Sequence, residues 1–101
     1  MKYLKVLVFC FTLILPSFAY ANDDGCGLIK ALYDSKDYVS AFNTAKTYAA
    51  DGGACAEYYL GVMYYTGYGT RPNGRLAVKY LNNATRKGYK PAKEYLSKRG
   101  G

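Results

Sequence analysis

Small residues and glycines recur along this chain at a fixed spacing. For residues 37–65, a shift of 36 positions superimposes five identical pairs: Ala41 and Ala77, Gly52 and Gly88, Ala56 and Ala92, Tyr59 and Tyr95, and Leu60 and Leu96. The alanines fall where two antiparallel helices would touch, and the glycines fall at expected helix ends. A period of this size is typical of stacked helical hairpins. The recurrence therefore favours a short helical repeat.

Apolar residues follow helical spacing, and no run alternates apolar and polar residues as a half-buried strand would. We therefore predict an all-α fold. Its expected helices cover residues 26–35, 38–50, 54–65, 75–87 and 91–99. Asp37 is the expected N-cap of the second helix, and Pro91 fits the first turn of the last one.

One stretch carries a recognisable family pattern. Its residues are Ala56, Leu60, Gly61, Tyr64, Gly67 and Gly69, followed by Ala77, Tyr80, Ala84 and Gly88. In these positions the chain resembles the SEL-like repeat family, which is related to the tetratricopeptide repeats. It departs from that pattern at Thr70, Asn73 and Ser97, and at Tyr80 the usual aromatic residue is tryptophan. The resemblance implies a short α/α solenoid of about five antiparallel helices, or two and a half hairpins, that serves as a protein-interaction module.

The first residues have the features of a secretory signal peptide. Lys2 and Lys5 precede an apolar stretch from Val6 to Leu15, and Ala19-Tyr20-Ala21 is a small-x-small cleavage site. The stretch is too short to cross a bilayer, which needs about 20 apolar residues. We expect cleavage after Ala21, export to the periplasm or the medium, and a mature domain over residues 22–101 without a transmembrane segment. An uncleaved anchor is the alternative.

Two cysteines, Cys26 and Cys55, remain after that cleavage. An exported domain of about 80 residues has a small core and often carries a covalent constraint. A bridge between these cysteines would contribute about 3–4 kcal/mol in the chain-entropy model. We predict this disulfide, with two buried free thiols as the alternative.

The chain offers little catalytic or metal-binding chemistry. It has no histidine, and two cysteines cannot form a four-thiolate zinc site. Asp34 and Asp37 lie at an expected helix junction, where aspartate ordinarily caps and turns. We expect no enzyme, no catalytic residue, no cofactor and no metal.

Charge changes sign along the expected mature chain. Residues 22–57 hold three basic and six acidic residues, whereas residues 58–101 hold nine basic residues and one acidic residue. On a helical wheel, Arg75, Lys79 and Arg86 form a stripe opposite the apolar face of their helix. Further basic residues would extend this stripe toward the C-terminus: Lys87, Lys90, Lys93, Lys98 and Arg99. The stripe is either a solvated surface or a surface that faces an anion.

Tyrosine is the second unusual feature. The expected mature chain has eleven tyrosines, five of them between residues 58 and 68. Tyr58, Tyr65 and Tyr68 lie partly away from the face that Leu60 and Tyr64 form. Exposed tyrosines supply much contact area at a small entropic cost. They serve either packing between repeats or recognition.

These features lead to three hypotheses. In the first, Tyr58, Tyr65, Tyr68 and the basic stripe hold an extended segment or acidic patch of another exported or envelope protein, as an adaptor or inhibitor. In the second, the basic C-terminal half binds an anionic envelope polymer or lipid. In the third, which lacks supporting residues, the chain is a small envelope hydrolase. Nucleic acid is not an expected partner.

Overall fold

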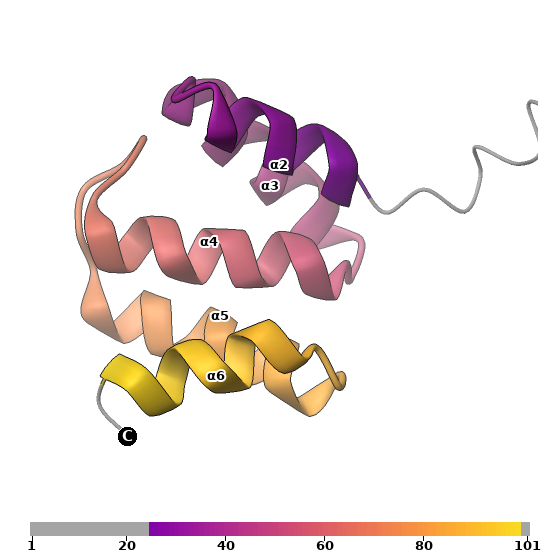
Figure 1. The fold of residues 1–101 in the computed structure, drawn as a ribbon, viewed down its shortest axis with the longest axis vertical. Helices are drawn as coiled ribbons and strands as arrows, with labels where there is room; N and C mark the ends of the chain where they lie inside the picture. Colours follow the sequence, from indigo (N-terminus) through magenta and orange to yellow (C-terminus); the bar gives the residue numbers. More distant parts are fainter. Residues whose placement is uncertain (1–24, 100–101) are drawn as a thin grey trace, which may run out of the picture.

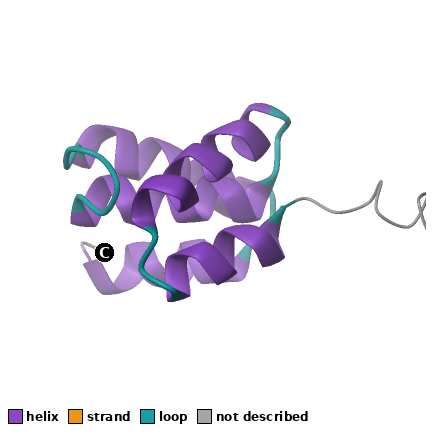
Figure 2. Ribbon diagram, turned by 90° about the horizontal axis from the view of Figure 1, so that it is seen from above, coloured by secondary structure: helices purple, strands orange, loops and turns teal. Residues whose placement is uncertain are grey.

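The computed structural model describes residues 25–99 of the 101-residue chain. Five helices follow one another in this part: α2 (Cys26–Asp34), α3 (Tyr38–Ala50), α4 (Ala54–Thr66), α5 (Gly74–Arg86) and α6 (Lys90–Arg99). Figure 2 shows these helices and the loops between them, with no strand among the described residues. The predicted all-α fold class is confirmed. The expected signal peptide, residues 1–21, lies outside the described residues.

Each helix packs against the next one in the sequence, and α2 also contacts α4. In Figure 1, α2 lies in front of α3 at one end of the molecule, α6 lies in front of α5 at the other end, and α4 lies between. The pairs α2–α3 and α4–α5 are thus two stacked hairpins, and α6 covers the second. None of the helices within residues 25–99 is long and apolar enough to cross a membrane.

Side-chain caps fix where two of the helices begin. The Asp37 carboxylate accepts a hydrogen bond from the Ser40 amide at 3.3 Å, as expected for an N-cap. The Asn73 side chain accepts one from the Leu76 amide at 3.1 Å. Asn73 is the N-cap, so α5 begins at Gly74, one residue before the predicted start.

The other predicted bounds are also within one residue of the structure. The predicted helices 26–35, 54–65 and 91–99 correspond to Cys26–Asp34, Ala54–Thr66 and Lys90–Arg99, and the predicted helix 38–50 matches Tyr38–Ala50. Gly67 ends α4 in the left-handed conformation, with φ of 84°. Glycine adopts this backbone without the penalty that a Cβ would add.

A glycine allows α4 and α5 to approach closely. A Cβ built on Gly61 would lie 2.5 Å from Cγ of Leu81 and 3.1 Å from the carbonyl oxygen of Ala77. Real side chains do not pack at such distances, so this position requires glycine. The close approach of α4 and α5 thus depends on the missing side chain of Gly61.

The buried side chains form two groups. The first, around α2, α3 and α4, consists of Ile29, Ala41, Phe42, Ala45, Ala56, Leu60 and Met63. The second, around α4, α5 and α6, consists of Val62, Leu81, Ala84 and Ala92. Tyr33 packs against both groups. The core therefore runs through the whole stack, and a side chain from the first helix contacts both parts of it.

Cys26 and Cys55 form a disulfide, with their Cα atoms 5.7 Å apart. The bond joins the first residue of α2 to the second residue of α4. A disulfide of this kind is typical of proteins that fold in an oxidising compartment. It adds a covalent link to the noncovalent contact between α2 and α4.

Candidate interaction surface

Eight tyrosines from four helices and two connections form one continuous set of ring contacts. We call this set the tyrosine cluster: Tyr33, Tyr38, Tyr58, Tyr59, Tyr65, Tyr68, Tyr89 and Tyr95. The centroids of contacting rings lie 4.4–6.3 Å apart. Such distances fit stacked and edge-to-face aromatic pairs, which stabilise beyond the area that they bury.

One half of the cluster surrounds Tyr33 of α2. Its ring lies 5.2 Å from that of Tyr38, 5.3 Å from that of Tyr59 and 6.2 Å from that of Tyr68. Tyr38 and Tyr68 are stacked at 4.4 Å. Tyr33 thus contacts rings from α3, α4 and the loop after α4.

The loop that carries Tyr68 is held against the start of α3. Gly69 has a φ of 76°, and a Cβ there would overlap the carbonyl oxygen of Tyr38. Asn73 donates its amide hydrogen to the carbonyl oxygen of Tyr64 at 2.7 Å, which closes the loop on α4. Close backbone contact at Gly69 therefore positions Tyr68 beside Tyr38.

The other half of the cluster surrounds Tyr58 of α4. Its ring contacts Tyr59, Tyr89 and Tyr95, and Tyr95 in turn contacts Tyr65. The guanidinium of Arg99 lies 5.1 Å from the ring centre of Tyr65 and 5.4 Å from that of Tyr95. These are cation–π distances, so the last described residue of α6 extends the cluster with a positive charge.

Most cluster residues are half-buried, but two are exposed. Tyr65 retains 39% of its accessible surface and Tyr68 retains 42%. They lie near the end of α4 and in the following loop, and each is in contact with half-buried rings. The cluster therefore forms a partly buried aromatic surface on which the side chains of Tyr65 and Tyr68 are exposed to solvent.

Burial raises the pKa of three cluster tyrosines, Tyr33, Tyr58 and Tyr59. It raises the pKa of Tyr33 from 10.0 to about 12, and the neighbouring Tyr38 and Tyr68 add to this effect. Burial also raises the pKa of Tyr58 and of Tyr59, the latter against the opposing effect of Lys30. Desolvation disfavours the phenolate, so these hydroxyls act as neutral hydrogen-bonding groups.

The three residues of the predicted basic stripe do not contact the predicted tyrosines of the cluster. Arg75, Lys79 and Arg86 are all exposed on α5. The Lys79 ammonium lies 5.7 Å from the ring centre of Tyr80, whose ring stacks on Tyr64, outside the cluster. Among the described residues, no ring, cation–π or polar contact joins the three stripe residues to Tyr58, Tyr65 or Tyr68. The structure brings the predicted tyrosines into one cluster without these three cations.

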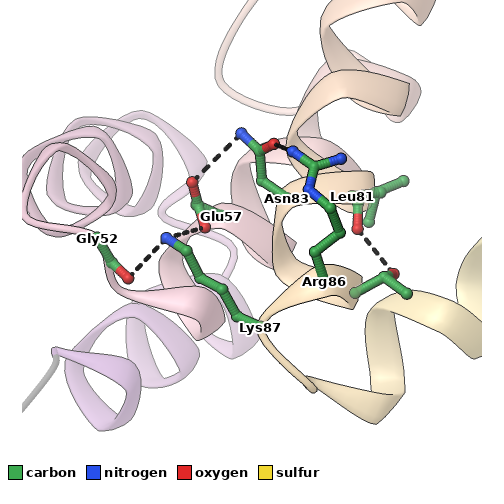
Figure 3. A network of polar contacts seen from close by, with 7 residues as sticks. Gly52, Glu57, Leu81, Asn83, Arg86 and Lys87 are labelled. Atoms are coloured by element: carbon green, nitrogen blue, oxygen red, sulfur yellow. Dashed lines mark hydrogen bonds and ion pairs between the residues drawn. The ribbon is translucent and has the colours of Figure 1, made fainter.

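A buried acid that the sequence analysis did not single out is Glu57 of α4. It is 6% exposed, and its Oε1 atom lies 2.8 Å from the Lys87 ammonium. Asn83 donates to its Oε2 atom at 3.5 Å, and Arg86 donates to the Asn83 side chain. Lys87 also donates to the carbonyl oxygen of Gly52 at 2.9 Å. Figure 3 shows this network.

This network corrects one expectation. Lys87 was expected to extend the basic stripe, but its ammonium pairs with the buried Glu57, although the Lys87 side chain is still partly exposed. Arg99 is also engaged, on the rings of Tyr65 and Tyr95. Of the residues expected to extend the stripe, Lys90, Lys93 and Lys98 are exposed and have no ion pair within residues 25–99.

A second surface feature lies at the turn between α5 and α6. An open cavity of about 330 Å³ is lined by Thr85, Gly88, Tyr89, Lys90 and Lys93. In the part of the chain that the structure describes, no group of three or more His, Cys, Asp or Glu side chains is placed to hold a metal ion.

Sequence reasoning missed five members of the cluster: Tyr33, Tyr38, Tyr59, Tyr89 and Tyr95. One signal for Tyr95 was present, since it coincides with Tyr59 when the sequence is shifted by 36 positions.

No protein-family model, curated protein or solved structure matches this chain. The similarity to SEL-like repeats therefore depends on the sequence pattern alone.

Proposed function

We propose that this chain is a non-enzymatic interaction module, a short SEL-like repeat that binds a segment of another exported protein. The observation that carries the proposal is the tyrosine cluster, with Tyr65 and Tyr68 exposed on top of half-buried rings. Tyrosine and arginine are enriched among the residues that dominate protein–protein binding energies. In this proposal, Tyr65, Tyr68 and Arg99 contact the partner, as an adaptor or inhibitor would.

Charge indicates the nature of the partner. Nine of the ten charged residues after position 57 are basic. Arg75, Lys79 and Arg86 are exposed and have no acidic partner among the described residues. Long-range attraction then favours an acidic surface and mainly raises the association rate. The tyrosines supply the contact, and the basic stripe supplies the attraction.

The test uses purified residues 22–101 to capture partners from an extract of exported proteins, followed by titration of the captured protein. Tyr65→Ala/Tyr68→Ala should weaken binding at least about tenfold, because each removes a large aromatic contact. Arg75→Glu/Lys79→Glu should slow association and reduce its salt dependence. Val78→Ala, an exposed apolar residue of α5, is the matched control. Wild-type affinity in the tyrosine double variant would refute the proposal.

A second candidate function is the binding of an anionic envelope polymer or lipid. Its support is the cavity at the α5–α6 turn, which two unpaired lysines line. Affinity for anionic vesicles should then fall steeply with salt. Lys90→Glu/Lys93→Glu should abolish it, while Tyr65→Ala/Tyr68→Ala leaves it unchanged. The reverse pattern would favour the tyrosine cluster.

A further inference from the structure

The two cysteines of the disulfide are unequally exposed. Cys55 is 2% exposed, whereas Cys26, at the start of α2, is only partly buried. Thiol–disulfide exchange begins with a thiolate that reaches one sulfur in line with the bond, so access decides which sulfur is attacked. An external thiol therefore reaches Cys26 more readily than Cys55.

Two features around Cys55 offset the cost of forming a thiolate at a buried sulfur. The Tyr89 hydroxyl donates a hydrogen bond to its sulfur at 3.4 Å. Cys55 lies in the first turn of α4, a helix of 13 residues. Partial positive charge at a helix N-terminus stabilises a thiolate, and a hydroxyl donor adds to this stabilisation.

The helix that begins at Cys26 is short and buries one residue fully. α2 has nine residues, its N-cap is Gly25, and Ile29 is its one buried residue within the helix. A helix of this length is marginal without tertiary contacts. The disulfide holds its first turn, and Tyr33 near its other end contacts three rings of the tyrosine cluster.

We propose that this disulfide is an exchange site for a dithiol reductant and that its cleavage releases α2 from the tyrosine cluster. A thiolate of the dithiol attacks Sγ of Cys26 and forms a mixed disulfide. The electron pair of the original bond passes to Sγ of Cys55, which leaves as a thiolate and takes up a proton. The second thiol of the dithiol then displaces Cys26. The dithiol loses two electrons and becomes a disulfide, and the protein disulfide gains them and becomes two thiols.

Release of α2 would withdraw Tyr33 from its contacts with Tyr38, Tyr59 and Tyr68. That consequence for binding rests on the proposed function, whereas the exchange reaction and the release of α2 do not. Oxidation would then switch the interaction surface on, and reduction would switch it off.

The first experiment identifies the sulfur that is attacked. Oxidised residues 22–101 are treated briefly with glutathione, free thiols are blocked with iodoacetamide, and both adducts are mapped by mass spectrometry. We expect glutathione on Cys26 and the blocked thiol on Cys55. Tyr89→Phe should slow the reaction with dithiothreitol about tenfold, since it removes a hydrogen bond to a developing charge. The control is Tyr95→Phe, whose buried hydroxyl has no hydrogen-bond partner within residues 25–99.

The second experiment measures amide hydrogen exchange with and without dithiothreitol. Reduction should speed exchange in α2 about tenfold or more and leave α4 and α5 protected. Cys26→Ala/Cys55→Ala should show the reduced pattern without any reductant. Glutathione on Cys55, unchanged α2 protection, or simultaneous loss of protection in all helices would each overturn the proposal. Neither experiment needs the binding partner, so failure of the proposed function would leave these results unaffected.

Discussion

Glu57 and Lys87 form an ion pair of 2.8 Å that links the first turn of α4 to the C-cap residue of α5. The acid is buried, and the Lys87 side chain retains 41% of its accessible surface. Lys87 donates to Gly52 as well. One ammonium group therefore connects the end of α5 to α4 and to the turn between α3 and α4.

Lys87→Met should lower the free energy of unfolding by about 1–3 kcal/mol, because it leaves a buried carboxylate without its cation. The partial exposure of Lys87 keeps the loss below that of a fully buried pair. Urea denaturation measures it. Lys30→Met is the control, since Lys30 pairs with Asp34 at the surface and its loss should be much smaller. Equal losses in the two variants would contradict this interpretation.

Gly61→Val should destabilise the fold by about 1–3 kcal/mol, because the new side chain would overlap Leu81. Thermal denaturation followed by circular dichroism measures the change. Gly27→Ala is the matched control: it is also a helical glycine, but a Cβ there meets nothing within 4 Å. That variant should be more stable by about 0.5–1 kcal/mol. A tolerated valine at position 61 would show that α5 can move away from α4.

Asp37→Ala should cost about 1 kcal/mol, because the Ser40 amide loses its acceptor at the start of α3. Asp37→Asn keeps an acceptor oxygen in the same place and should retain most of the stability. Both values come from urea denaturation. If the asparagine variant is as unstable as the alanine variant, the negative charge matters more than the hydrogen bond.

The raised pKa of Tyr33 predicts that the protein loses stability at alkaline pH. Its pKa is about 12 in the folded protein and 10.0 ordinarily, so the folded state binds this proton more tightly than the unfolded state. The free energy of unfolding should therefore be unaffected by this group below about pH 10 and fall as the pH rises toward 12. Tyr33→Phe should reduce that fall in denaturation series across this range. An unchanged slope would place the alkaline sensitivity elsewhere.

Much of the fold could be predicted because its determinants are local. Asp37 is a capping residue immediately before a helical pattern, and Gly67 ends one. These features involve short-range geometry that residue type reveals directly. The spacing of the alanines indicated a repeat of two-helix units, but the contact of Gly61 with Leu81 is known only from the structure.

The surface was harder to predict because its contacts are long-range. Tyr58, Tyr65 and Tyr68 were identified, but their grouping with Tyr33 and Tyr95 depends on how α2, α4 and α6 lie beside one another. Lys87 looked like one more surface cation, and only the folded chain shows Glu57 next to it. A helical wheel describes one helix and contains no information about which side chains from other helices fill the space around it.

The contact between Gly69 and Tyr38 has a consequence for affinity. Because the loop backbone is fixed there and the Tyr68 ring rests on Tyr38, this side chain already occupies a restricted range of conformations before any partner arrives. In the proposed interaction, association would then cost less conformational entropy at Tyr68, so a larger part of the contact energy would contribute to affinity. The entropy of ordering this loop is therefore lost during folding and not during binding.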